Sequence, residues 1–212
     1  MRNAGKRYWV LMLTLIGMGI GYLILLGYML QSRNTAFTPE KMASPEPTRV
    51  LIELWDAYEQ ARVVAQQQAE DAQLVSASTQ WQGAEERALL EGAGDWAFVF
   101  YSPARGVSLD VVVSAGAARI VNQTRVWNDP NTMAEGAWQT GPRDAMLIFL
   151  ARGGRAFLDE HPQAVVNLRL SENEQGDAVW DVVALALASE EHNRRLFSMQ
   201  VNAKTNHVVR SD

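Results

Sequence analysis

The sequence has no cysteine among its 212 residues and only three histidines. Without cysteine, the chain can form no disulfide, thiolate metal site, Cys-x-x-Cys-His haem attachment, thioether lipid anchor or cysteine nucleophile. None of His161, His192 and His207 stands at helical ligand spacing from another histidine or an acidic residue. Glu190 and Glu191 flank His192, but adjacent side chains on one turn rarely converge on a metal, so we expect a solvated polar turn there.

Motifs that bind phosphate or perform hydrolysis are missing as well. The chain contains no Gly-x-Ser-x-Gly, P-loop, His-Glu-x-x-His or dinucleotide-binding glycine motif. Gly92 and Gly94 precede a strand-like segment instead of joining a strand to a helix, so they do not predict a phosphate cradle. We therefore predict that the protein is not an enzyme, and we expect no catalytic residue, cofactor or metal site.

Charge is also missing from the apolar stretch of residues 8–30. At about 1.5 Å per residue, a helix of this length measures roughly 35 Å, which is enough to cross a hydrocarbon core of about 30 Å. Arg2, Lys6 and Arg7 precede the stretch, and this excess of positive charge predicts a cytoplasmic N-terminus at residues 1–7. The C-terminal part is then expected on the periplasmic or other extracytoplasmic side of a bacterial inner membrane, held by a single pass.

A cleaved signal peptide is the competing interpretation of this stretch. Signal peptides have a shorter apolar core of about 7–15 residues and a small-x-small cleavage site, whereas residues 29–33 offer no such site. Gly17 and Gly21 form a Gly-x-x-x-Gly pair on one helix face, where a second helix can approach closely. This pair is a candidate helix-packing site, although glycine is also simply common in membrane helices.

The remainder of the chain is acidic. Residues 1–41 hold five cations and one anion, whereas the whole chain has a net charge of −5, which leaves −9 for residues 42–212. Such a domain is a poor ligand for nucleic acid, because nucleic-acid binding depends on neutralising phosphates. It could face a basic partner such as a c-type cytochrome, or the acidity could simply keep the domain soluble.

A spacer, a helix and strands are expected next. Residues 31–47 contain three prolines and predict an extended linker. Small and apolar residues then recur every three or four positions, which predicts a helix from Thr48, as its N-cap, to Ala72. Runs rich in aromatic and β-branched residues, typical of strands, follow at residues 74–81, 96–101 and 107–122, the last folded into a hairpin at 114–116. We therefore assign residues 48–126 to a first α-β-β-β unit.

The connecting segment 127–141 combines aromatic residues with Asn, Asp, Pro and Gly. Trp127, Met133 and Trp138 are candidate contacts for a partner protein, because aromatic residues in polar loops often anchor interfaces. The alternative is that they fold back over an open sheet edge or over a seam between the two units. The sequence leaves both interpretations open.

A second α-β-β-β unit is expected over residues 142–212. Pro142 suits the first position of a helix, which His161 and Pro162 should end, and Gly153 with Gly154 would let the sheet approach that helix closely. Strand-like runs follow at residues 164–170, 179–188, 196–201 and 207–209.

The two units match as an internal repeat. Trp96–Val99 corresponds to Trp180–Val183, 84 positions later, and Val113–Val121 corresponds to Val201–Val209, 88 positions later. A four-residue insertion between the two matches is ordinary. Repetition of one supersecondary unit therefore organises the chain.

The strands beginning at Trp96 and Trp180 and the two final hairpins resemble PepSY-type modules, and more loosely cystatin-like and nuclear-transport-factor-like α+β folds. Residues 201–208 are similar to the V-x-A-x-T-G-x-V ending of such modules, with Asn206 where glycine is usual. Asparagine also tolerates the left-handed conformation of a tight hairpin. The first copy departs further, because Gly116 is displaced. The resemblance covers residues 48–212 and implies a helix packed across a curved antiparallel sheet, in a noncatalytic, extracytoplasmic binding or regulatory module.

Together these features predict an α+β protein with one N-terminal transmembrane helix and two α-β-β-β units, each a helix packed on an antiparallel sheet. The expected function is that of a noncatalytic accessory subunit of a bacterial membrane complex, most naturally a respiratory or photosynthetic electron-transfer assembly. Its partners would be the lipid bilayer and the integral and extracytoplasmic subunits of that complex. The alternative is a free-standing, membrane-tethered binding or regulatory module of PepSY type.

Overall fold

The computed structural model describes residues 51–83, 85–187 and 194–211, which belong to the second of two units in the chain, Arg49–Asp212. The expected membrane span with Gly17 and Gly21, the linker, the N-cap at Thr48 and the turn at Glu190–His192 lie outside the described residues. Among the described helices, none combines the length and the apolarity that crossing a membrane requires.

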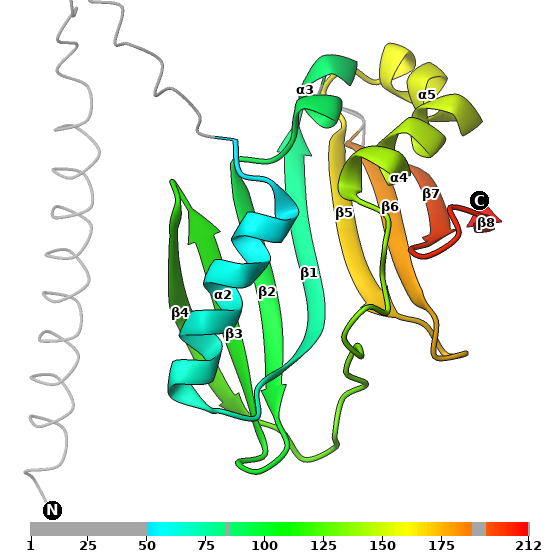
Figure 1. Cartoon of the computed structure of the whole chain (residues 1–212). Coiled ribbons are helices and arrows are strands. Elements are labelled where there is room, and N and C mark those ends of the chain that lie inside the picture. Colours follow the sequence, from blue (N-terminus) through cyan, green and yellow to red (C-terminus); the bar gives the residue numbers. More distant parts are fainter. Residues whose placement is uncertain (1–50, 84, 188–193, 212) are drawn as a thin grey trace, which may run out of the picture. The chain divides into compact units, whose positions relative to one another are not determined.

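The first half of the folded unit consists of one long helix, one short helix and four strands (Figure 1). These elements are α2 (Leu54–Gln68), β1 (Gln73–Gln82), α3 (Glu86–Glu91), β2 (Asp95–Ser102), β3 (Val107–Ser114) and β4 (Ala117–Arg125).

The second half has a broken helix and four strands. These elements are α4 (Pro142–Phe149), the wide turn η1 (Leu150–Gly154), α5 (Arg155–Glu160), β5 (Val165–Glu172), β6 (Ala178–Leu187), β7 (Arg194–Asn202) and β8 (Val208–Ser211). The predicted start of this helix at Pro142 and its end before His161 are confirmed.

All the strands form a single antiparallel sheet in the order β4-β3-β2-β1-β5-β6-β7-β8. The two halves meet where β1 pairs with β5, from Ser76 opposite Ser171 to Gln82 opposite Val165. This pairing corrects the expectation that each helix packs on a sheet of its own, because the shared ladder merges the two sheets. The buried side chains of both halves accordingly form one hydrophobic core.

The first helix is shorter than predicted, since it begins at Leu54 and ends at Gln68. The chain before it is extended, because Ile52 forms a β-bridge with Ala93 and donates its backbone N–H to the Ala93 carbonyl at 2.9 Å. At the other end Ala69 returns to an extended conformation. The repeat of apolar residues alone could not show that these flanking residues are extended and not helical.

Side chains of α2 that face the sheet are small. Ala57, Ala61 and Ala65 are fully buried and follow one another at a spacing of four residues, which brings the helix close to the strands. The helix packs on β2, β3 and β4, where its partners include Phe98 and Phe100. In this half the large core side chains therefore come from the strands, and the small residues of the helix let it pack close to the sheet.

The helix of the second half is interrupted at a glycine pair, which sequence analysis had marked for close packing. Gly153 has φ = +117°, a conformation that favours glycine, and a Cβ there would lie 3.2 Å from the Phe197 ring of β7. A Cβ on Gly154 would meet the ring of Phe149 at 2.5 Å. The prediction that the pair lets the sheet approach the helix is therefore confirmed for Gly153, whereas Gly154 makes room for a ring of the helix itself.

Two buried tryptophans link each helix entry to the sheet in the same way. Trp96 on β2 donates its indole N–H to the carbonyl of Ile52 at 3.1 Å, and Trp180 on β6 donates to the carbonyl of Thr140, also at 3.1 Å. Each acceptor lies two residues before the first residue of its helix, Leu54 or Pro142. The shared contact supports the internal repeat more directly than the weak sequence match does.

The final hairpins of the two halves turn through left-handed residues. Ala115 and Gly116 have φ values of 50° and 77° between β3 and β4, and Asn206 has a φ of 60° between β7 and β8. The prediction that Asn206 replaces glycine in a left-handed position is confirmed. Each half therefore contains four strands, because the last hairpin contributes two full strands.

Candidate functional site

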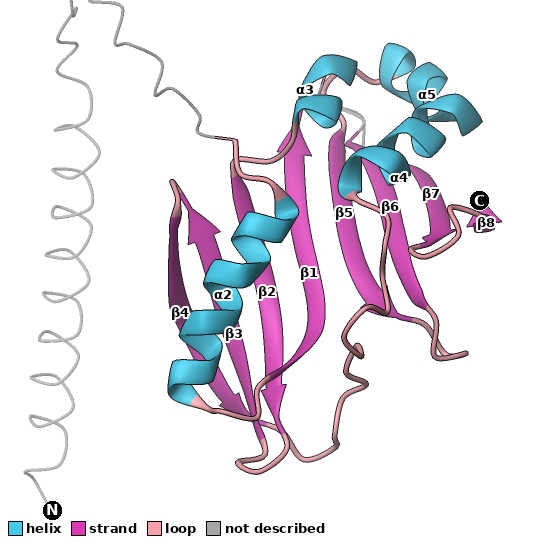
Figure 2. Cartoon of the chain, viewed as in Figure 1, coloured by secondary structure: helices cyan, strands magenta, loops and turns pink. Residues whose placement is uncertain are grey.

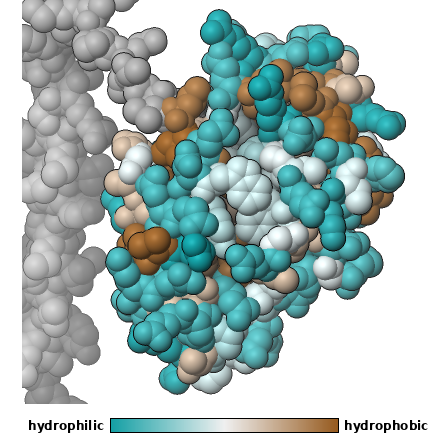
Figure 3. Space-filling model, in the orientation of Figure 1, coloured by the Kyte–Doolittle hydropathy of each residue, from teal (hydrophilic) through white to brown (hydrophobic). Residues whose placement is uncertain are grey.

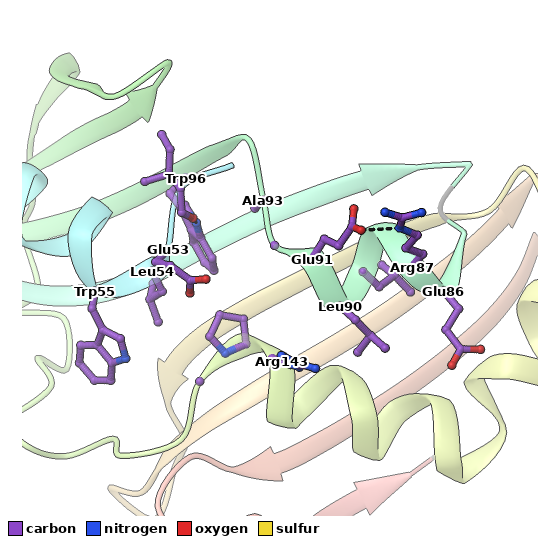
Figure 4. Close-up of a pocket in the computed structure, with 15 residues that line it drawn as sticks. Glu53, Leu54, Trp55, Glu86, Arg87, Leu90, Glu91, Ala93, Trp96 and Arg143 are labelled. Atoms are coloured by element: carbon purple, nitrogen blue, oxygen red, sulfur yellow. Dashed lines mark hydrogen bonds and ion pairs between the residues drawn. The ribbon is translucent and has the colours of Figure 1, made fainter. Parts of the chain in front are cut away.

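A cavity of about 680 Å³ opens where the N-terminal ends of α2 and α4 meet α3 (Figure 4). Its wall combines apolar side chains, such as Leu54, Leu90 and Trp96, with charged residues of α3 and α4 and with the N-cap residue of α2. In Figure 4, Leu90 of α3 and Arg143 of α4 lie close together, while Glu53 lies at the start of α2. The cavity thus sits at the seam between the two halves, and we call it the seam cavity.

Most charges around the seam cavity are already paired. Arg87 forms an ion pair with Glu91 within α3, and Arg155 of α5 binds Glu86 through two nitrogens at 2.6 and 2.8 Å. The hydrogen bonds from Arg155 hold the pKa of Glu86 below its ordinary value. The pair between Glu86 and Arg155 also fastens α3 to the helix of the second half.

Glu53 and Arg143 are the charged residues of the cavity wall that form no ion pair among the described residues. Both side chains are exposed. The cavity wall holds three carboxylates, those of Glu53, Glu86 and Glu91, but no histidine or serine among the described residues. The expectation that the protein is not an enzyme therefore stays a prediction.

An aromatic stack lies beside the seam. Trp138 lies parallel to Trp55 with ring centroids 5.4 Å apart, and its edge meets Tyr58 at 5.3 Å. Burial raises the pKa of Tyr58. The indole N–H of Trp138 has no hydrogen-bond partner among the described residues, so packing alone holds this side chain in place.

The three residues proposed as partner contacts have different environments. Trp127 is 92% exposed, whereas Met133 and Trp138 are only 6% and 5% exposed. The backbone N–H of Met133 donates to the carbonyl of Leu74 at 2.8 Å, which ties the segment to β1. Met133 and Trp138 thus follow the alternative interpretation, covering the core at the seam, and only Trp127 stays available as a predicted contact.

Within the described residues, no group of three or more metal-binding side chains comes together. His161 instead packs against the ring of Phe157 at the end of α5, with centroids 4.8 Å apart. The residues at Glu190–His192 lie outside the described part of the chain. The expected absence of a metal site therefore stays a prediction.

The described helices all lie on one face of the sheet (Figure 2). Polar residues cover most of that helical side, and apolar residues gather there in separate patches (Figure 3). The opposite face carries no described helix, and we call it the open face. Side chains alternate between the two faces, so the neighbours of the buried Phe98, Val111 and Val182 point to the open face.

Most side chains on the open face are uncharged, although Asp95, Asp110, Asp181, Arg119 and Arg169 also lie on it. Examples that are partly or fully exposed are Ser78, Ala97, Ser108, Val112, Asn167 and Ser198. A hollow of about 570 Å³ lies on this face over β5 to β8, and its wall includes Asn167, Ser198 and Leu196, which is 60% exposed. Alternation in the strands could have predicted these positions from the sequence, but the joining of the two halves into one face could not.

Comparison with known proteins identifies no family for this chain. No protein-family model and no curated protein sequence matches the chain. A crystal structure from Clostridium difficile, titled as that of a "putative lipoprotein", is 12% identical, with a TM-score of 0.44 over 74% of this chain and 91% of the other. A likeness at this level carries no argument about function, so the proposals below rest on the residues of this chain.

Proposed function

We propose that this protein is a noncatalytic interaction module, tethered to a bacterial membrane by residues 8–30, that binds a protein partner through the open face of its sheet. The supporting observation is that one face of an eight-stranded sheet carries no described helix and is lined mostly with uncharged side chains, with arginines and aspartates spaced among them. The uncharged positions of such a surface allow a flat partner to approach closely, because short side chains cost little to desolvate or order.

Two versions of this proposal differ in the partner. In the first, the chain is an accessory subunit of a membrane complex such as an electron-transfer assembly, as the sequence predicts. In the second, it is a free-standing module of PepSY type that meets its partner transiently. Detergent extraction and native mass measurement distinguish them, since a stoichiometric complex is expected for a subunit and a solitary species for a free-standing module.

A bulky substitution on the open face tests the proposal itself. Ala97 is exposed at the middle of β2 on that face, so Ala97→Trp should block a docked partner without changing the charge. Ala151 is exposed on the helical side, within η1, and Ala151→Trp is the matched control. We expect Ala97→Trp to abolish partner association of the full-length protein and Ala151→Trp to preserve it; equal association of both variants would contradict the proposal.

A further inference from the structure

The two outer strands of the sheet differ in length. β8 has four residues, whereas β4 has nine and pairs with β3 alone among the described strands. An outer strand presents a row of backbone N–H and C=O groups to which another strand can add. All residues of β4 are at least partly exposed, and the strand contains no proline or lysine. The long edge of β4 is therefore the place where a further strand can join this sheet.

A β-bulge divides this edge into two parts. The register with β3 shifts at Val121, which is an extra residue between Ile120 and Asn122. Bulges disrupt the local ladder and bend the strand. The register is continuous again over residues 122–125. A strand that adds to this edge is therefore expected to pair with the regular stretch 122–125.

Two glutamines lie at the middle of this stretch. Gln123 of β4 and Gln68 of α2 are both exposed, and the Gln68 amide donates to the side-chain oxygen of Gln123 at 3.2 Å. A primary amide both donates and accepts hydrogen bonds, so each of these side chains can pair with a copy of itself. Arg119, on the far side of the bulge, cannot, because like charges directly opposite each other destabilise a pair of strands. The chemistry of the regular stretch thus suits a second copy of this chain as its partner.

Two β4 edges can pair in a register that avoids like charges. Opposite residues in an antiparallel pair point to the same side of the sheet, so the two-fold axis must pass through a residue and not between two residues. An axis through Gln123 places Asn122 opposite Thr124 of the second copy and leaves Arg119 beyond the paired stretch. We propose that the protein forms a symmetric dimer in which the β4 edges of two copies pair antiparallel about Gln123. This pairing leaves the open face free, so the inference does not depend on the proposed function.

Helix α2 leaves room for this contact. The helix packs on β2, β3 and β4, so its axis lies inside the edge of the sheet. Neighbouring strands are about 4.8 Å apart, which places the two copies of α2 roughly 10–14 Å from each other. Packed helices lie about 8–10 Å apart. The two sheets can therefore join without a collision between the helices.

Single cysteine substitutions test the pairing, because the chain contains no cysteine of its own. Gln123→Cys places two thiols opposite each other at the axis, and oxidation of the full-length protein in lipid vesicles should give a disulfide-linked dimer. Arg119→Cys, on the same edge, and Ser108→Cys, on the neighbouring strand β3, are the matched controls. Their thiols would lie farther from their copies than the roughly 7 Å between Cα atoms that a disulfide can span, so these variants should stay monomeric.

Charges at the axis give a second, independent test. Gln123→Arg and Gln123→Glu each place two like charges opposite each other and should weaken the dimer about fivefold, as native mass measurement of the full-length protein in detergent records. An equimolar mixture of the two variants should restore the dimer, because arginine then faces glutamate.

Three results would overturn the proposal. The first is equal disulfide formation in Gln123→Cys and Arg119→Cys, and the second is a monomeric unchanged protein. The third is a dimer of equal strength in the unchanged protein, Gln123→Arg and Gln123→Glu, which is the result expected if residues 8–30 alone held the two copies together.

Discussion

The two halves of the folded unit use one arrangement with different helices. In the first half an unbroken helix, α2, lies close to the sheet through fully buried alanines, and aromatic rings of β2 fill the space. In the second half the helix is interrupted at η1, and Phe149 and Phe197 meet edge to face at 5.5 Å across the break. In the first half the aromatic rings of β2 fill the space beside the helix alanines, whereas in the second half the helix and the sheet each contribute a ring.

Both halves share one contact, the hydrogen bond from a strand tryptophan to a backbone carbonyl just before the helix. Trp96 and Trp180 are at most 2% exposed, and each holds a backbone carbonyl at 3.1 Å. Helix–sheet packing can be rebuilt with different side chains, provided that total volume is kept. The tryptophan contact therefore defines the repeat, whereas the helix is where the two copies have diverged.

The largest expected effect comes from removing these tryptophans. Trp96→Ala and Trp180→Ala should each lower the free energy of unfolding by about 3–5 kcal/mol, because a large buried ring leaves a cavity. Trp→Phe at either position keeps much of the ring but leaves the carbonyl of Ile52 or Thr140 without its partner, at a cost of about 1–3 kcal/mol. Urea unfolding of the full-length protein measures both. A cost below about 1 kcal/mol for one alanine variant would show that the two contacts are not equivalent.

A smaller loss of stability is expected at the glycine pair, which only the second half contains. Gly154→Ala places a methyl group 2.5 Å from the Phe149 ring, and we expect a loss of about 1–3 kcal/mol from overpacking. Gly141→Ala is the control, since nothing lies within 4 Å of the added methyl group and the residue has a φ of −90°. Thermal unfolding should separate the two variants; equal melting temperatures would mean that the aromatic cluster adjusts freely.

The smallest expected effect concerns the turns. The β2–β3 turn is held by Asp71, which accepts hydrogen bonds from the Ser102 hydroxyl at 2.6 Å and the Ala104 N–H at 2.7 Å. These bonds, above all the one from Ser102, hold the pKa of Asp71 below its ordinary value. The β7–β8 turn instead uses the neutral Asn202, whose side-chain oxygen accepts the Lys204 N–H at 3.0 Å.

Acid should therefore loosen the first turn and leave the second unchanged. A carboxylate with a lowered pKa stabilises the fold above its unfolded pKa, and that contribution is lost as the pH falls through its folded pKa, below about pH 4. Ser102→Ala should raise the pKa of Asp71 toward the ordinary value, which carboxyl-carbon NMR titration measures. An unchanged pKa in Ser102→Ala, with Ser108→Ala as the control, would contradict this role.

Local patterns predicted most strands and the second helix, because alternation and turn residues act over short distances. Pro142, the turn residues Ser114–Gly116 and the left-handed Asn206 are examples in which one residue type limits the backbone. The pairing of β1 with β5 was not predictable, since both strands are equally compatible with the edge of a separate sheet. For the same reason the continuous open face was not predictable, because its two halves come together only through that pairing.

Helix α3 was missed as well, since six residues are too few to show a periodic pattern. Of the candidate site residues, the environment of Trp138 depends on stacking with Trp55, 83 positions earlier in the chain. Composition marked the segment 127–141 as unusual, but only tertiary contacts could separate its buried members from Trp127. Distant contacts thus account for what the sequence left open.

The antiparallel pairing of β1 with β5 joins two copies of one strand through the same edge. Such self-complementary contact is the rule of two-fold symmetric dimers. A half-length chain that ends before the connecting segment would leave β1 as an unpaired edge strand. We expect two such chains to dimerise through this strand. Gene duplication followed by fusion would turn that association into a covalent, single-chain form, and would free each copy to change independently.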